Sequence, residues 1–411
     1  MKKLSIILVV SALIAALTIV GCTQKSVTPT PEVPKTLKVG LCVPLSGPVA
    51  DWGIPVKQGL ELRIEQINNA GGVKIGQDTY NIELIAEDNL FTSDGAKTAA
   101  EKLIYRDHVN VICGGIASHD TLGVQLVTTP AKIINCSMAW TSEALKPEGQ
   151  PTVPYAFKSL PTPHETIRGI WGYIQQAYPQ AKKVALLDAN DMSSRYGEAL
   201  NAKWLKYIGL QVVSEEYYEY GTKDFVPILT KVLSQNPDVI HSGSAGMSEL
   251  GTFIKQSRQM GYKGLFMQEI PITGELLFQT SGQEAANGLV TYDFLCYGPK
   301  TTSEYQDFAK AFKEKYGYWI SAVSAQPAFI DCFVQAVEKA GGISDTDKIV
   351  GILETGTFKS FGVDMRFAGA DYYGRPRMLS QPLLISEIKG GEQVPVGNIT
   401  VDEQLTPWPI E

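Results

Sequence analysis

Hydroxyl and aromatic side chains gather in short segments that follow apolar, strand-like runs of the chain. These segments are residues 46–52, 116–121, 139–141 and 190–196, with two more after Ser242 and Gln268. In open parallel sheets, ligands bind beyond the carboxyl ends of the strands. A helix N-terminus at such a place presents free N–H groups and a partial positive charge, and hydroxyl groups add uncharged donors. This chemistry suits a small anion such as a carboxylate.

The spacing of the other reactive residues predicts neither a metal site nor an enzyme. The four histidines (His108, His119, His164 and His241) show no ligand spacing, and no Cys-x-x-Cys pair occurs. The Gly-x-Ser-x-Gly, His-Glu-x-x-His and P-loop patterns are missing, as is a Gly-x-Gly-x-x-Gly after the first strand. We therefore expect no metal, no cofactor and no catalysis. An enzyme without a recognisable motif is the alternative.

Composition and charge narrow the class of protein further. The chain has 411 residues, of which 44% are hydrophobic and 19% charged, which excludes fibrous and wholly disordered classes. The formal net charge is −7 and no basic cluster occurs, so we expect no nucleic-acid partner. The length predicts two domains, with three as the alternative.

The N-terminus has the features of an export signal. Lys2 and Lys3 precede an almost entirely apolar run over residues 4–20. A transmembrane anchor is the alternative, because seventeen residues come close to the length of a span. The segment Ile19-Val20-Gly21-Cys22 resembles the lipobox of bacterial lipoproteins. This resemblance implies a signal peptide over residues 1–21 and a diacylglyceryl anchor on Cys22.

The segment after the signal predicts a tether. Residues 22–35 contain Pro29, Pro31 and Pro34, which favour an extended chain that buries nothing. We expect the globular part to lie outside the cytoplasm, close to a membrane. Three cysteines, Cys42, Cys113 and Cys136, lie in or beside apolar runs and are interpreted as buried hydrophobic residues, with a Cys42–Cys113 disulfide as the alternative.

Strand-like and helix-like patterns alternate along the chain. The expected strands cover residues 38–45, 82–86, 109–113, 133–136, 183–188, 210–215, 238–242 and 265–268. The expected helices cover residues 56–69, 96–104, 122–129, 166–177, 195–208, 225–234, 247–260, 303–316 and 328–340. Apolar strands alternating with helices predict an α/β fold with parallel sheets covered on both faces, in two successive units.

An ordered set of short motifs resembles the branched-chain amino acid receptors, which are substrate-binding proteins of ATP-driven importers. The set begins with Pro44-Leu45-Ser46-Gly47-Pro48 and runs over residues 37–390. It continues with Trp52-Gly53, Gly59, Ile67-Asn68, Ala70-Gly71-Gly72, Arg195-Tyr196-Gly197, Gly221-Thr222-Lys223-Asp224-Phe225, Leu229 and Asn236-Pro237-Asp238-Val239.

The resemblance implies a type I periplasmic-binding fold with two doubly wound parallel-sheet lobes, joined by a three-strand hinge. The implied first lobe is 36–158 plus 291–362, the second is 159–290 plus 363–396, and residues 397–411 form a tail. The implied function is capture of a small amino acid or carboxylate and delivery to an ABC permease, by a protein expected to be a monomer. A ligand sensor with the same fold is the alternative.

The resemblance also implies a set of ligand-binding residues. These are Trp52, Ser118, Ala139, Trp140, Thr141, Tyr196, Ser244 and Glu269. Trp52 would pack on the ligand side chain, and Tyr196 matches an aromatic residue of the second lobe, with packing on the lobe surface as the alternative for both. Glu269 would pair with an α-ammonium group. Local roles are the alternatives: Ser118 and Thr121 could cap a helix starting at Leu122, Thr141 could cap the next turn, and Glu269 could be a solvated rim carboxylate.

Two departures from the family pattern lie beside Ser118. Ala117 stands where aliphatic-type members often carry one partner of a local disulfide, and His119-Asp120 replaces small hydroxyl residues. Both changes could reshape the pocket. Strict leucine specificity is therefore not implied, and aromatic amino acids, aromatic carboxylates and amides stay open as ligands.

Overall fold

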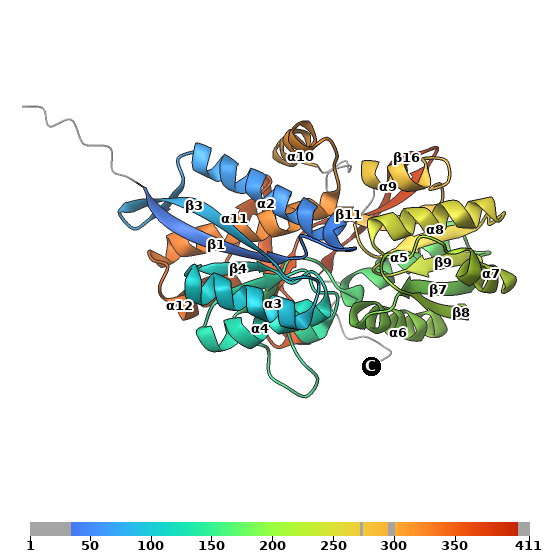
Figure 1. Cartoon of the computed structure of the whole chain (residues 1–411), viewed down its shortest axis with the longest axis horizontal. Coiled ribbons are helices and arrows are strands. Elements are labelled where there is room, and N and C mark those ends of the chain that lie inside the picture. Colours follow the sequence, from blue (N-terminus) through green and yellow to red (C-terminus); the bar gives the residue numbers. More distant parts are fainter. Residues whose placement is uncertain (1–33, 272–273, 295–300, 402–411) are drawn as a thin grey trace, which may run out of the picture. The chain divides into compact units, whose positions relative to one another are not determined.

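The computed structural model describes residues 34–271, 274–294 and 301–401 (Figure 1). Its first sheet has nine strands, and its central strands β3, β1, β4, β5 and β6 are parallel neighbours. In sheet order the strands are β12 (Phe358–Ser360), β13 (Val363–Ala368), β14 (Met378–Ser380), β6 (Ala156–Lys158), β5 (Ile134–Ser137), β4 (Val111–Gly114), β1 (Lys35–Val43), β3 (Asp78–Asp88) and β2 (Val73–Ile75).

The second sheet has seven strands and again a parallel centre, formed by β8, β7, β9, β10 and β11. In sheet order its strands are β16 (Glu392–Ile399), β15 (Leu383–Lys389), β11 (Leu289–Phe294), β10 (Leu265–Gln268), β9 (Val239–Ser242), β7 (Lys183–Ala189) and β8 (Gln211–Tyr218). We call the first sheet with its helices the first lobe, and the second sheet with its helices the second lobe.

Helices cover both faces of the first sheet because alternate residues of its strands point to opposite sides. Leu41 belongs to the core packed under α2 and α11, whereas Cys42 belongs to the core under α3 and α4. Figure 1 shows these two pairs of helices on either side of the sheet. The first-lobe helices are α2 (Ala50–Asn69), α3 (Ser93–Glu101), α4 (Ser118–Ala131), α10 (Ser303–Tyr316), α11 (Ala325–Ala340), α12 (Thr346–Thr355) and α13 (Ala370–Tyr373), with short turns at Lys102–Arg106, Ser142–Ala144 and Ser321–Ser324.

The second lobe repeats the same layered arrangement. Helix α6 packs on β7 and β8, and α8 packs on α9. Figure 1 shows α6 on one side of the sheet and α8 with α9 on the other. Its helices are α5 (Pro163–Ala177), α6 (Met192–Tyr207), α7 (Val226–Ser234), α8 (Met247–Gln259) and α9 (Glu275–Ser281). Both lobes therefore bring the carboxyl ends of several parallel strands to one edge.

Within the described residues, the chain passes between the two sheets three times. It leaves the first sheet after β6, returns between β11 and β12, and crosses again between β14 and β15. The sheet membership differs from the expected lobe limits at two places: residues 289–294 pair in the second sheet, and residues 363–380 pair in the first. The expected limit at residue 291 divides the buried strand β11, which begins at Leu289, and the short strands β13 and β14 extend the first sheet beside β6.

The alternating core of the fold follows the sequence closely. The expected helix over residues 303–316 has those bounds in the structure, and the expected strands of both parallel centres are present. The helix expected at 122–129 is longer and runs from Ser118 to Ala131. Pro130 lies in its last turn, where it removes one backbone hydrogen bond, and the helix ends at the next residue. The sheets are mixed rather than wholly parallel, because β2 and the C-terminal strands add antiparallel edges.

Four cysteines lie among the described residues. Cys42, Cys113 and Cys136 are buried and free, as is Cys332, so the Cys42–Cys113 disulfide is wrong. Within the same described part of the chain, no helix combines the length and the apolar character that a membrane span needs. Cys22 and the predicted signal peptide lie outside the described residues.

Candidate functional site

A cavity lies where the carboxyl ends of the two sheets meet. Each residue that lines it belongs to the loop or first helical turn after a strand, in both lobes. The first lobe contributes Val49, Trp52, Phe91, Ile116, Ala117, Met138, Trp140 and Leu160, and the second contributes Asp191, Ser193, Tyr220, Ser244 and Ile270. This is the place at which parallel α/β sheets bind ligands.

The first-lobe wall of the cavity is almost wholly apolar. Trp52 lies in the first turn of α2 and is 4% exposed, and Trp140 follows β5 and is 2% exposed. Together with Phe91 and Met138 they present carbon surface to the cavity. The enclosed volume is only about 30 Å³ in this closed arrangement, against roughly 150 Å³ for a cavity that admits benzene. A ligand of that size therefore requires the lobes or these side chains to move.

The second-lobe wall is polar, and its groups are already hydrogen-bonded within the protein. Asp191 caps α6 by accepting a bond from Ser194 N at 2.7 Å, and it accepts a second from the Tyr220 hydroxyl at 2.9 Å. Ser244 Oγ lies 2.6 Å from Ser194 Oγ. These bonds hold the wall in one geometry before any ligand is considered.

The two lobes touch at the edge of the cavity through serine side chains. Ser118 N, at the start of α4, donates to Ser193 Oγ at 3.0 Å, and Ser193 Oγ donates to Ser118 Oγ at 3.0 Å. Ser193 lies in the first turn of α6. The N-termini of two helices, one from each lobe, therefore approach the same place, and both carry partial positive charge. This arrangement favours a negative group between them.

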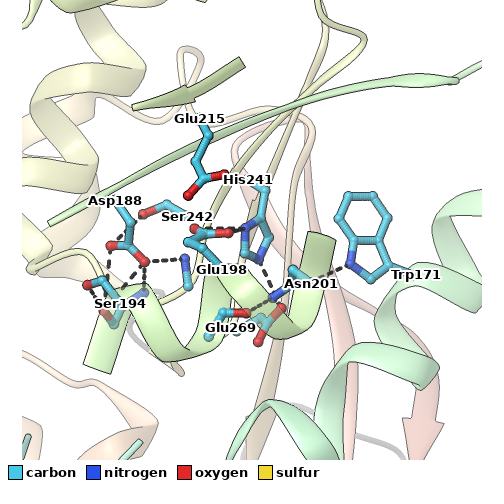
Figure 2. Close-up of polar contacts among 12 residues, drawn as sticks. Trp171, Asp188, Ser194, Glu198, Asn201, Glu215, His241, Ser242 and Glu269 are labelled. Carbon is cyan, nitrogen blue, oxygen red and sulfur yellow. Dashed lines mark hydrogen bonds and ion pairs between the residues drawn. The ribbon is translucent and has the colours of Figure 1, made fainter. Parts of the chain in front are cut away.

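A buried ionic triad lies behind the second-lobe wall (Figure 2). His241 on β9 has Nδ1 2.8 Å from Glu198 Oε2 on α6, and Nε2 2.9 Å from Glu269 Oε1 after β10. All three side chains are fully buried. Burial alone would lower the pKa of His241, but the two carboxylates raise it to about 10. The imidazole is therefore charged at neutral pH and bridges the two acids.

A third buried carboxylate supports the loop that carries Ser244. Asp188, at the end of β7, accepts bonds from Gly243 N at 2.9 Å and Ser244 N at 3.0 Å (Figure 2). Burial raises the pKa of Asp188 well above its ordinary value, and the nearby Glu198 raises it further. Both loop N–H groups are thus used internally. Among the described residues, no group of three or more histidine, cysteine or acidic side chains is placed to hold a metal ion.

Five of the predicted site residues lie at the cavity or directly beside it. Trp52, Trp140 and Ser244 line it. Ala139 is buried between two lining residues, and Ser118 follows the lining residue Ala117 and binds Ser193. The suggestion that Ser118 caps a helix starting at Leu122 is wrong, because Ser118 is itself the first residue of α4.

The other three predicted residues have partners away from the cavity lining. Thr141 Oγ1 accepts a bond from Glu143 N at 3.2 Å, which is the local cap that the sequence left open. The Tyr196 hydroxyl lies 2.6 Å from Ser142 Oγ and 3.1 Å from His164 Nδ1, in a separate groove. Glu269 binds His241 and is 0% exposed, so the solvated-rim alternative is wrong.

Sequence reasoning missed several lining residues, of which Phe91 and Tyr220 are the largest. Each lies shortly after a strand, β3 and β8 respectively, so the rule used for the other segments would have found both. Asp191 and Ser193 lay within the candidate segment 190–196 but were not singled out. Their hydrogen-bond partners come from distant parts of the chain, which the sequence does not show.

Comparison with known proteins gives a family and a set of relatives. A family model described as periplasmic binding protein matches residues 36–392. A leucine-, isoleucine-, valine-, threonine- and alanine-binding protein of Pseudomonas aeruginosa is 24% identical over 355 residues, covering 85% of this chain and 89% of the relative. A Leu/Ile/Val-binding protein homolog of Brucella abortus is 24% identical over 353 residues, covering 83% and 87%.

Solved structures share the fold over nearly the whole chain. The branched-chain amino acid transporter substrate binding protein LivJ of Streptococcus pneumoniae, in complex with isoleucine, superposes with a TM-score of 0.75 at 21% identity, covering 89% of this chain and all of the other. A solute binding protein of an ABC transporter from R. palustris, in complex with 4-hydroxybenzoate, gives 0.75 at 19% identity, covering 90% and 98%. The two-lobed fold and the resemblance noted in the sequence are confirmed. These relatives are binding proteins, which confirms the non-enzymatic interpretation.

Proposed function

This chain belongs to the periplasmic binding protein family, and we propose that it captures a small carboxylate or amino acid in the cavity between its two lobes. The observation that carries this proposal is the origin of the lining residues, which all follow strands of the two sheets. A site built from two lobes binds by enclosing its ligand, because each lobe supplies only one wall.

The geometry supports separate places for the apolar part and the negative group of the ligand. The Trp52 and Trp140 side chains would pack on the apolar part of the ligand, and the N-terminus of α4 with the Ser118 and Ser193 hydroxyls would bind its negative group. Hydrogen bonds to a charged group contribute about 1.5–3 kcal/mol each. Since the enclosed space is small, the ligand would enter an open form and shift the population toward the closed one by its differential affinity.

The ligand class is proposed from the wall chemistry and from the named relatives together. Relatives include a protein that binds aliphatic amino acids and structures in complex with isoleucine or 4-hydroxybenzoate. Aromatic side chains at Trp52, Phe91, Trp140 and Tyr220 can accommodate either a branched aliphatic group or a ring. We therefore propose a ligand with one negative group and one apolar group of this size.

The setting of the protein is proposed from the N-terminal sequence. Cleavage before Cys22 and diacylation of its thiol would anchor the chain outside the cytoplasm, and residues 22–35 would tether the lobes to the bilayer. From there the closed form would deliver its ligand to an ABC permease. Replacing Cys22 by Ser is expected to release the protein from membranes in a fractionation experiment. Retention of the variant in the membrane fraction after detergent-free washing would contradict lipid anchoring.

The binding proposal is tested by a thermal-shift screen of amino acids, aromatic acids and amides, followed by calorimetry. A ligand at 100 times its Kd is expected to stabilise the fold by roughly 2.7 kcal/mol through mass action. Trp52→Ala is expected to lower the affinity of the selected ligand at least tenfold, whereas Tyr105→Ala, which removes a 62% exposed ring on another surface, should not. Absence of any stabilising compound, or equal affinity in wild type and Trp52→Ala, would contradict the proposal.

A further inference from the structure

A strained turn after β3 carries Phe91 into the cavity. Leu90 and Phe91 have φ angles of 55° and 54°, in the left-handed region that residues with a side chain rarely adopt. Phe91 lines the cavity, while the neighbouring Leu90 is 61% exposed. Two consecutive residues of this kind persist only where the surroundings hold them, and such strain gathers at binding sites.

The side chains at the end of β3 hold the turn from within. Asp88 Oδ1 accepts a bond from Leu90 N at 2.9 Å, and Asn89 Oδ1 accepts one from Phe91 N at 2.9 Å. Asp88 Oδ1 also accepts a bond from Leu45 N at 3.0 Å. The turn is therefore tied to the neighbouring loop after β1, which leads to Trp52.

The first turn of α4 holds the same segment from the other side. His119 Nε2 donates to Phe91 O at 2.9 Å, and its ring meets the Phe91 ring edge-on at 4.8 Å between centroids. Asn89 Nδ2 donates to Asp120 Oδ2 at 2.8 Å, and that oxygen also accepts a bond from Ile116 N at 3.1 Å. Asp120 is fully buried. The two residues that depart from the family pattern thus both bind the turn.

The Phe91 ring reaches across to the second lobe. It meets the Tyr220 ring edge-on at 5.3 Å between centroids. The Tyr220 hydroxyl donates to Asp191 Oδ2 at 2.9 Å, so this partner is itself held in place. Since both rings line the cavity, the contact forms a wall that joins the lobes.

We propose that the Phe91 ring sets the upper size limit of the ligand, and that His119 and Asp120 are positioning residues that hold the ring in the cavity. This inference rests on the proposed function and deepens it, because it names what selects among ligands with one negative and one apolar group. It also gives His119-Asp120 a role: the pair fixes the turn rather than contacting the ligand.

The positioning role is tested without any ligand, by hydrogen–deuterium exchange of the segment over residues 88–93. In His119→Ala the amide of Phe91 is expected to exchange at least tenfold faster than in the wild type. His119→Gln keeps an N–H donor for Phe91 O and is expected to restore slow exchange. Unchanged exchange in His119→Ala, or equally fast exchange in both variants, would overturn the positioning role.

The size limit is tested with two matched pairs of probes, leucine with phenylalanine and benzoate with 4-phenylbenzoate. The pair used is the one whose smaller compound stabilises the wild-type protein in the thermal-shift screen. Phe91→Ala is expected to shift the affinity ratio toward the larger probe at least tenfold, and His119→Ala to shift it in the same direction. Tyr105→Ala is the control with an exposed ring and should leave the ratio unchanged.

The outcomes separate this inference from the function on which it rests. An unchanged ratio in Phe91→Ala, or the same shift in Tyr105→Ala, would overturn the size limit while leaving solute binding intact. A wild type that binds neither smaller probe nor any compound of the screen contradicts the proposed function, and the size limit falls with it. The exchange experiment then still decides whether His119 positions the turn.

Discussion

The two walls of the cavity are built on different physical principles. The first-lobe wall consists of Trp52, Trp140 and other apolar side chains held by packing, together with Phe91 on its hydrogen-bonded turn. The second-lobe wall consists of Ser193, Ser244 and other polar groups held by hydrogen bonds, with fully buried carboxylates behind them. One wall therefore offers apolar surface that sets the shape of the cavity, and the other offers fixed polar geometry.

Substitutions in the two walls should therefore have different effects. A change in the charged network behind the second lobe leaves a buried charge without its partner, which destabilises the whole fold. A change in the first-lobe wall alters the shape of the cavity, and its effect should appear in ligand selection more than in folding.

The largest expected effect is on the buried triad. Glu198→Ala removes one of the two carboxylates that bind His241, and the imidazolium then has only Glu269. Breaking a buried ion pair costs about 3–5 kcal/mol, so the free energy of unfolding in urea should fall by that amount. Glu83→Ala, an exposed residue of β3, is the control and should change it by less than about 0.5 kcal/mol. A loss below about 1 kcal/mol in Glu198→Ala would contradict the importance of the triad.

A pH effect of intermediate size is expected in the first lobe. Burial raises the pKa of Asp120 to about 6, from roughly 3.9 in an unfolded chain. Between these values the folded state holds a proton that the unfolded state has released, so the free energy of unfolding falls as pH rises from 4 to 6. The loss attributable to this group is about 3 kcal/mol.

Asp120→Asn measures this contribution, because the amide keeps an acceptor for the turn but does not titrate. Between pH 4 and pH 6 the unfolding free energy of the wild type is expected to fall relative to that of Asp120→Asn. Above pH 6 the difference between the two proteins is expected to be constant. Urea unfolding at several pH values measures that difference. A difference that is independent of pH would show that Asp120 is ionised in the fold as it is in water.

The smallest effect in free energy is expected where the walls touch. A Cβ on Gly197 of α6 would lie 2.6 Å from Trp140 Nε1, a buried and bulky side chain of the other lobe. Gly197→Ala should therefore disfavour closure and weaken ligand binding about tenfold, equivalent to 1.4 kcal/mol. Gly172→Ala in α5 is the matched control, because nothing lies within 4 Å of its added Cβ.

Both glycine variants replace a helix-interior glycine and gain helix propensity of up to about 1 kcal/mol. Only Gly197→Ala should lose affinity in calorimetry with the ligand that the screen selects. Equal affinities in the two variants would mean that the Trp140 contact does not contribute to the bound state.

Much of the fold could be predicted because apolar strands and amphipathic helices leave periodic patterns. The helix over residues 303–316 and the strand over residues 265–268 were predicted with their bounds. The C-terminal strands of residues 358–380 and 383–399 were missed. Strands β12 and β14 have only three residues each, and β16 is a largely half-buried edge strand, so neither kind leaves a continuous apolar run. The buried strand β15 begins with Leu383-Leu384-Ile385, an apolar run that was not used. The extension of α4 back to Ser118 was missed because its first turn is polar.

The sequence could predict those site residues whose place is set by their position just after a strand. It could not predict those whose side-chain orientation is set by a partner far away in the chain. Trp52, Trp140 and Ser244 follow strands and line the cavity. Glu269 also follows a strand, but its side chain binds His241, a residue 28 positions away in the chain. The sequence could not reveal that pairing, nor the hold of His119 and Asp120 on the Phe91 turn, because both depend on tertiary contacts.

A crystal structure of the protein with the ligand from the thermal-shift screen would show whether the ligand binds in the cavity between the lobes. The ligand is expected to lie between the lobes, in contact with Trp52 and Trp140 on one wall and with Ser193 or Ser244 on the other. A ligand bound instead in the surface groove between Tyr178 and Leu265, or in the groove beside Tyr196, with the cavity between the lobes unchanged, would contradict the proposed site.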